Sequence, residues 1–211
     1  MSEFTPADVW RDMRDGNDRF IAGTPAHPRQ DVERRSELAM AQTPKAALFG
    51  CSDSRLSAEI IFDQGLGDLF VVRNAGQVIS SSVLGSLEYA VEVLGAALIV
   101  VLAHDSCGAV EAAMQKDADP ATAFPPNIGG IVDDILPAVV RTRESAGVAQ
   151  GEPLDSSAVG REHLRDTISA LLAQSELISQ KIADGKLAVV GANYRLAEGR
   201  VISDVVVGDV D

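Results

Sequence analysis

Two short segments of the chain carry side chains that could bind a metal ion and act on a small molecule. The first is C-S-D-S-R, residues 51–55. If this segment is extended, Cys51, Asp53 and Arg55 point to one side, because alternate residues of an extended chain share a face. The carboxylate and guanidinium are then close enough to pair. The alternative is a polar turn with a surface ion pair that contributes little to stability.

The second segment is H-D-S-C-G, residues 104–108, directly after the most apolar run of the chain. A histidine and a cysteine three residues apart can face a common centre where a strand turns into a helix. Together with Cys51 they offer two thiolates and an imidazole, which are ligands that zinc prefers. The alternative is a core histidine beside a buried, inert thiol.

Three protein ligands leave one zinc position open, and we expect a water to bind there and act as a zinc-bound hydroxide nucleophile. Asp53 is placed either to accept a hydrogen bond from that water or to become the fourth ligand in an inactive state. Arg55 would compete with zinc for Asp53. We interpret the other two histidines, His27 and His163, as surface residues.

The elements that must position these side chains follow from hydrophobic patterns. Short apolar runs predict buried strands, and longer amphipathic stretches between them predict helices. This alternation favours an α/β fold with a mostly parallel central sheet flanked by helices. Both motifs directly follow strands, and open α/β sheets bind ligands at the carboxyl ends of their strands. We expect strands at residues 46–50, 69–72, 98–102 and 187–191, and helices at 80–94, 109–116, 128–144 and 161–185.

The remaining segments are a separate helix and two irregular stretches. Residues 6–23 place apolar side chains at helical spacing and predict an amphipathic N-terminal arm, which could pack on this core or on a neighbouring chain. Residues 117–127 and 146–160 are rich in small residues or proline and are expected to be surface loops. Residues 1–211 are expected to form a single domain.

Composition excludes several classes of protein. The net charge of −13 makes a nucleic-acid partner unfavourable, and the longest strongly apolar run, residues 96–103, is far too short to cross a membrane. The N-terminus lacks the pattern of a secretory signal, so we expect a cytoplasmic protein. In that compartment the chain's two cysteines are better explained by a metal or catalytic role than by a disulfide.

The two motifs resemble the zinc-site signatures of the β-class carbonic anhydrases, C-x-D-x-R and H-x-x-C-G. The resemblance extends to residues 67–76, 86–91 and 191–194 and covers roughly residues 6–205. It implies a zinc enzyme that reversibly hydrates carbon dioxide to bicarbonate and a proton. The metal would lie on Cys51, His104 and Cys107. Asp53 would align the zinc-bound hydroxide as one half of a catalytic dyad, and Arg55 would hold Asp53 off the metal.

The resemblance also implies a substrate pocket and an assembly. Gln42, Phe70 and Tyr89 match the family's pocket residues, and the backbone N–H of Gly108 would face the bound anion. The site would lie at the interface of a homodimer or homotetramer, with the N-terminal arm packing on the partner subunit.

Two other functions stay open at this point. The same scaffold could hydrate carbon disulfide, or it could be a non-catalytic zinc-stabilised or bicarbonate-sensing module. An intact Asp53–Arg55 pair argues against the module, because a purely structural zinc site needs no such pair.

Overall fold

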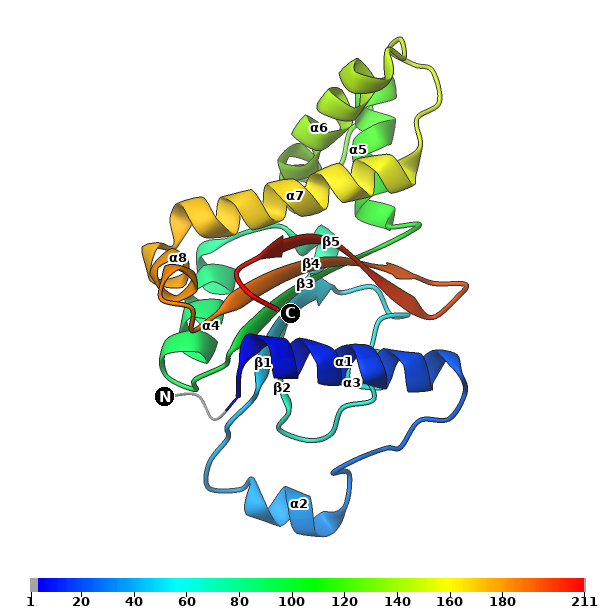
Figure 1. Cartoon of the computed structure of the whole chain (residues 1–211). Coiled ribbons are helices and arrows are strands. Elements are labelled where there is room, and N and C mark those ends of the chain that lie inside the picture. The colour runs from blue at the N-terminus through cyan, green and yellow to red at the C-terminus, as the bar shows by residue number, and fades with distance from the viewer. Residues whose placement is uncertain (1–3, 211) are drawn as a thin grey trace.

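The computed structural model describes residues 4–210, and its centre is a five-stranded sheet in the order β2-β1-β3-β4-β5 (Figure 1). The first four strands run parallel, as predicted, and β5 runs antiparallel to β4. The strands are β1 (Ala46–Cys51), β2 (Leu69–Asn74), β3 (Leu98–His104), β4 (Ala188–Arg195) and β5 (Arg200–Val207).

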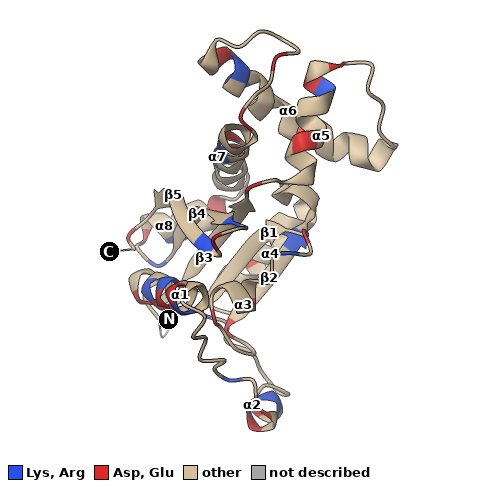
Figure 2. Ribbon diagram, turned by 90° about the vertical axis from the view of Figure 1, so that its right-hand side faces the viewer, with Lys and Arg blue, Asp and Glu red and all other residues tan. Residues whose placement is uncertain are grey.

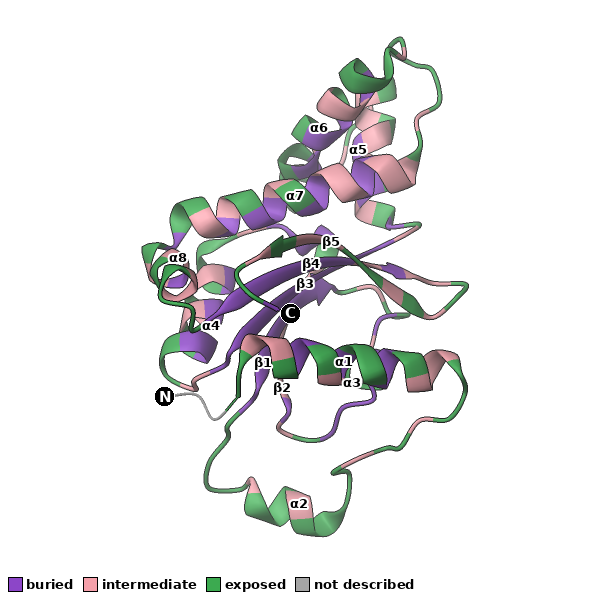
Figure 3. Cartoon of the chain, in the orientation of Figure 1, coloured by how far each residue is buried: buried purple, intermediate pink, exposed green. Residues whose placement is uncertain are grey.

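Strand β5 was not predicted. Its residues are mostly β-branched but only partly buried, because it is an edge strand. By contrast, every residue of β1 and β3 is buried, which explains why these two strands are readable as continuous apolar runs (Figure 3).

Helices cover both faces of the sheet. On one face lie α1 (Pro6–Ile21) and α3 (Ala58–Ile61), and on the other lie α4 (Ser81–Glu92), α7 (Ser156–Gln174) and α8 (Glu176–Ala183). Helices α5 (Gly108–Ala118) and α6 (Pro126–Ala146) pack against each other and extend beyond the sheet (Figure 1). Two shorter elements, α2 (Val32–Glu37) and the 3₁₀ turn η1 (Ala75–Gln77), complete the chain.

The helix predicted at 161–185 is two helices, so that prediction was wrong in its extent. Ser175 separates them: its hydroxyl accepts a hydrogen bond from the Ile178 N–H and donates one to Glu88 across the packed face. Because Ser175 caps the start of α8, the first helix ends there, although the spacing of the apolar residues continues unchanged. Helix α7 also begins five residues before its predicted start, capped by Asp155, which shortens the loop expected at 146–160.

The N-terminal helix is confirmed, and its apolar face packs on its own chain. Val9, Trp10 and Met13 are buried against the sheet, within the same core as Ile61. The buried Asn17 amide fixes this arrangement, because it donates to the carbonyls of Ile61 and Gly199 and accepts from the Val201 N–H. We expected this arm to pack on a partner subunit, but its apolar face is already covered in cis. Any contact with a partner would use the other faces of α1.

Charged side chains lie mainly on the helices and loops, and the strands are largely free of them (Figure 2). In the described part of the chain, no helix is both long and apolar enough to span a membrane.

Candidate metal centre

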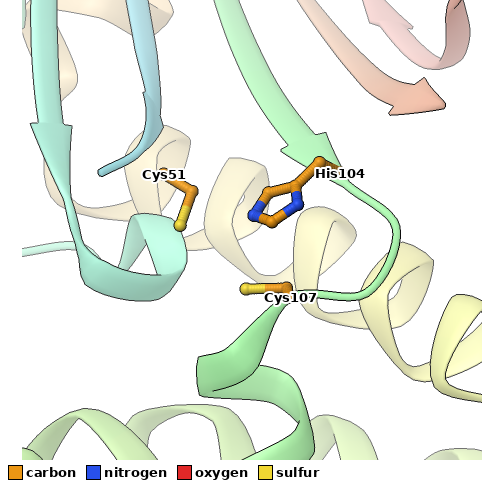
Figure 4. Close-up of side chains that lie close together, drawn as sticks. All are labelled: Cys51, His104 and Cys107. Atoms are coloured by element: carbon orange, nitrogen blue, oxygen red, sulfur yellow. The ribbon is translucent and has the colours of Figure 1, made fainter. Parts of the chain in front are cut away.

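The structure brings Cys51, His104 and Cys107 together at the carboxyl edge of the sheet (Figure 4). One candidate ligand atom from each residue lies within 4.8 Å of the others, and all three residues are buried. Cys51 ends β1, His104 ends β3, and Cys107 is the residue before α5. Because β1 and β3 are parallel neighbours, their ends must meet at this edge.

His104 has the form expected of a metal ligand. Its Nδ1 lies 2.8 Å from the Asp105 carbonyl oxygen, so Nδ1 carries the proton and Nε2 has a free lone pair. Nε2 is buried and has no hydrogen-bond partner among residues 4–210. A buried acceptor without a partner is costly, and a metal ion would satisfy it. Two thiols and an unpartnered imidazole nitrogen are a donor set that fits zinc.

The two cysteine sulfurs are electrostatically coupled. The pKa of Cys51 is lowered to about 4, mainly by the neighbouring Cys107 thiol, and the pKa of Cys107 is raised, mainly by its interaction with Cys51 and by burial. The pair therefore holds a single negative charge, because two thiolates side by side repel each other. Burial lowers the pKa of His104, but the neighbouring Cys51 thiolate outweighs burial and the net shift is upward. A divalent cation would supply the charge that stabilises both thiolates.

Asp53 and Arg55 form the ion pair that the sequence predicted. Arg55 Nε and Nη2 lie 2.8 and 2.7 Å from the two oxygens of Asp53. The Arg55 guanidinium holds the pKa of Asp53 well below its usual range. Arg55 Nη2 also donates to the Ser106 carbonyl, which lies between His104 and Cys107. One guanidinium thus joins the two motifs, and the Asp53 carboxylate pairs with it rather than joining the three-residue donor cluster.

Arg73 contacts the same segment, and the sequence analysis assigned it no role. It lies on β2, and its guanidinium donates to the backbone carbonyls of Cys51 and Asp53 at 2.9 and 2.7 Å. Both contacts are to main-chain oxygens, so no pairing of side-chain types in the sequence could have revealed them. The feature of the sequence that could have indicated this role was an arginine close to the end of β2, the strand next to β1.

The turn after β2 places a backbone donor on a ligand sulfur. The Gly76 N–H donates to Cys51 Sγ at 3.5 Å. Gly76 has φ +73°, and a Cβ at this position would lie 2.9 Å from both the Ala109 Cβ and the Ile135 Cδ1. Only glycine therefore lets this backbone pass between Cys51 and the helices behind it.

The expected pocket residues do not gather at the cluster within one chain. Phe70 pairs with Ala47 in the sheet, whereas Cys51 pairs with Asn74, four residues further along β2. At about 3.3 Å per residue, Phe70 lies roughly 13 Å along the strand from the level of Cys51. Its ring contacts Tyr89, with centroids 6.2 Å apart.

The other two predicted contact residues lie at opposite edges of the sheet. Gln42 is exposed in the loop that leads into the amino end of β1. Gly108 is adjacent to Cys107 and begins α5, with open space where a side chain would be. Only Gly108 of the four lies next to the metal cluster in its own chain.

The prediction that His163 is a surface residue was wrong. His163 is 3% exposed, and its Nε2 donates to the Gly76 carbonyl at 2.7 Å. The charged residues around it in sequence belong to the outer face of α7, and the histidine lies on the inner face. His27 is exposed, as expected.

Comparison with known proteins agrees with this geometry. The carbonic anhydrase family model matches residues 46–201. Carbonic anhydrase 2 of Mycobacterium tuberculosis is 46% identical over 210 residues, covering 100% of this chain and 98% of that protein. A carbonic anhydrase of Mycolicibacterium smegmatis is 45% identical over 212 residues, with the same coverage of both chains.

Solved structures show the same fold. The β-carbonic anhydrase CcaA matches with a TM-score of 0.73 at 24% identity, covering 93% of this chain and 87% of that one. A tetrameric β-carbonic anhydrase from Sordaria macrospora matches with a TM-score of 0.71 at 23% identity, covering 93% and 96%. With the family model, the full-length relatives and the cysteine–histidine cluster in agreement, this chain belongs to the β-carbonic anhydrase family.

Proposed function

We propose that this chain reversibly hydrates carbon dioxide to bicarbonate and a proton, with Cys51, His104 and Cys107 holding zinc and Asp53 and Arg55 completing the site. The observation that carries the proposal is the convergence of three buried donors beside a doubly hydrogen-bonded Asp–Arg pair. When bound, the zinc ion acts as a Lewis acid that lowers the pKa of water, which makes water a nucleophile near neutral pH.

Asp53 orients the attacking water. Its pairing with Arg55 keeps the carboxylate ionised, so it can accept a hydrogen bond but cannot donate one. Accepting a hydrogen bond from the water fixes the direction of the oxygen lone pair, which must point at the carbon of carbon dioxide. Positioning of this kind contributes to rate because it removes the cost of aligning the reactants.

Arg55 has two tasks in this proposal. It holds both oxygens of Asp53, which keeps that carboxylate from the coordination position that water must occupy. It also fixes the loop between His104 and Cys107 through the Ser106 carbonyl. The backbone N–H of Gly108, at the positive end of the α5 dipole, would stabilise negative charge on bicarbonate.

A second copy of the chain would supply the rest of the pocket. Phe70 and Tyr89 lie far from the cluster of their own chain, and Tyr89 is 46% exposed. Their pocket role, and that of Gln42, therefore requires a homodimer or homotetramer in which this end of one subunit meets the cluster of another. Light scattering coupled to gel filtration tests this, and an active monomer would contradict it.

Metal analysis combined with a stopped-flow hydration assay tests the function. We expect one zinc per chain and carbon dioxide hydration that disappears when the metal is removed and returns when zinc is added. Stoichiometric zinc without hydration would instead support the non-catalytic module. Hydration of carbon disulfide in preference to carbon dioxide would support the other enzyme.

A further inference from the structure

The buried His163 is connected to the metal cluster through a single residue, Gly76. His163 Nε2 lies 2.7 Å from the Gly76 carbonyl oxygen, and the N–H of the same residue lies 3.5 Å from Cys51 Sγ. A carbonyl oxygen can only accept, so Nε2 must carry the proton. We propose that His163 is a positioning residue that holds the Gly76 N–H on the Cys51 sulfur and thereby tunes this ligand of the proposed zinc site.

The Gly76 segment depends on such support. Its backbone is in the left-handed region, at φ +73°, a non-helical conformation inside the 3₁₀ turn η1. The hydrogen bond from His163 satisfies the buried Gly76 carbonyl. The Gly76 carbonyl and the Gly76 N–H belong to two adjacent peptide groups that meet at one Cα. A hydrogen bond that fixes the carbonyl therefore also restricts the rotation that would turn the N–H away from the sulfur.

The Gly76 N–H changes the electronic properties of the Cys51 sulfur. An N–H group pointing at a thiolate withdraws electron density from the sulfur and fixes the direction of its remaining lone pairs. Cys51 is buried, and the Gly76 N–H is one of the groups that lower its pKa. Partners one shell outside a metal site commonly change metal affinity 10- to 100-fold when removed, by an order-of-magnitude estimate.

A matched control lies one helical turn away. Thr167 is also 3% exposed on the inner face of α7, and its hydroxyl lies 2.9 Å from the His163 carbonyl oxygen and 3.3 Å from the Gln77 carbonyl oxygen, which share its one proton. It therefore contacts the same turn, but one residue further from the N–H that faces the sulfur. A general packing role predicts the same effect for both residues, whereas the proposed role predicts an effect for His163 alone.

The test uses three full-length variants, His163→Leu, His163→Gln and Thr167→Val, each loaded with zinc or with cobalt(II) as a spectroscopic probe. We expect His163→Leu to bind zinc at least about 10-fold more weakly in chelator competition. Its thiolate-to-cobalt charge-transfer band should shift to longer wavelength, because a sulfur without the N–H donor gives up electrons more easily. His163→Gln, whose amide can donate to Gly76, should restore both values, and Thr167→Val should leave both unchanged.

An unchanged band and zinc affinity in His163→Leu would overturn the inference, as would equal shifts in Thr167→Val. If His163→Leu does not fold, the wild-type protein loaded with ¹¹³Cd decides. A scalar coupling between the Gly76 amide proton and the metal supports the inference, and its absence overturns it. The inference rests on the proposed zinc site, and a wild-type protein that binds neither zinc nor cobalt would contradict that site itself.

Discussion

Arg55 binds Asp53 through two parallel hydrogen bonds, so the carboxylate beside the metal cluster is held by a guanidinium from the same short segment. The two residues are separated by a single residue, and the backbone N–H of Arg55 also donates to Asp53 at 2.9 Å. The side chain of Asp53 is 17% exposed, and that of Arg55 is 50% exposed. The pair therefore lies where the buried cluster opens to solvent, which is where a small substrate must arrive.

Asp53→Ala should separate metal binding from catalysis. We expect zinc content to be unchanged, because Asp53 is not part of the donor cluster, and carbon dioxide hydration to fall at least about 10²-fold through loss of orientation. Asp8→Ala is the control, because it removes another aspartate paired with a nearby arginine, on the exposed face of α1. Hydration by Asp53→Ala at the wild-type rate would remove the role given to this carboxylate.

Arg73→Gln should loosen the segment that carries Cys51 and Asp53. Its guanidinium holds two main-chain carbonyls there, and a glutamine is too short to reach both. We expect zinc affinity to drop by about 10-fold and hydration to fall with it. Chelator competition and stopped-flow assays measure the two effects. Arg165→Gln, which disturbs only exposed pairs with Glu162 and Asp204, should change neither.

Gly76→Ala should destabilise the protein by about 1–3 kcal/mol, because the added methyl meets two side chains and the backbone is left-handed. Gly85→Ala is the matched control in α4, where a Cβ meets nothing within 4 Å. Removing a glycine from a helix interior should stabilise it by about 0.5–1 kcal/mol. Urea unfolding of both variants measures these changes. Equal effects of the two substitutions would contradict the special role of the Gly76 backbone.

The stability of the protein should decrease in mild acid because of His163. Burial lowers the pKa of His163 below its usual value of 6.5, and the nearby Asp166, Asp134 and Cys51 oppose this shift only in part. Below pH 6.5 the unfolded chain therefore binds a proton that the folded chain does not. Folding stability is complete above this pH and declines below it, by up to about 1.4 kcal/mol per pH unit.

The difference between wild type and His163→Gln isolates this contribution, because the other titrating groups cancel. We expect the difference in the free energy of unfolding to change between pH 6.5 and 5 and to be constant above pH 7. A constant difference for His163→Gln across the whole range would mean that His163 is protonated as easily in the folded state as in the unfolded state.

Residues close together in the chain were sufficient to predict the cysteine–histidine cluster and the ion pair. Cys51, Asp53 and Arg55 lie within five residues, and His104 and Cys107 within four, so local geometry and the ends of two parallel strands determine how they meet. The buried strands were equally readable, because a strand covered on both faces must be apolar throughout. Short-range patterns were therefore enough to identify the parallel strands, the carboxyl edge of the sheet and the donor set at that edge.

The groups that support this site from distant parts of the sequence can be identified only in the folded chain. Arg73 reaches backbone carbonyls, Gly76 presents an N–H, and His163 approaches from a helix 87 residues further along the chain. Backbone contacts leave no trace in side-chain patterns, and a histidine in a charged stretch looks the same whether it faces inward or outward. The edge strand β5 was not predicted, for a related reason. Its pairing with β4 depends on a partner strand and not on its own burial, and only the folded chain supplies that partner.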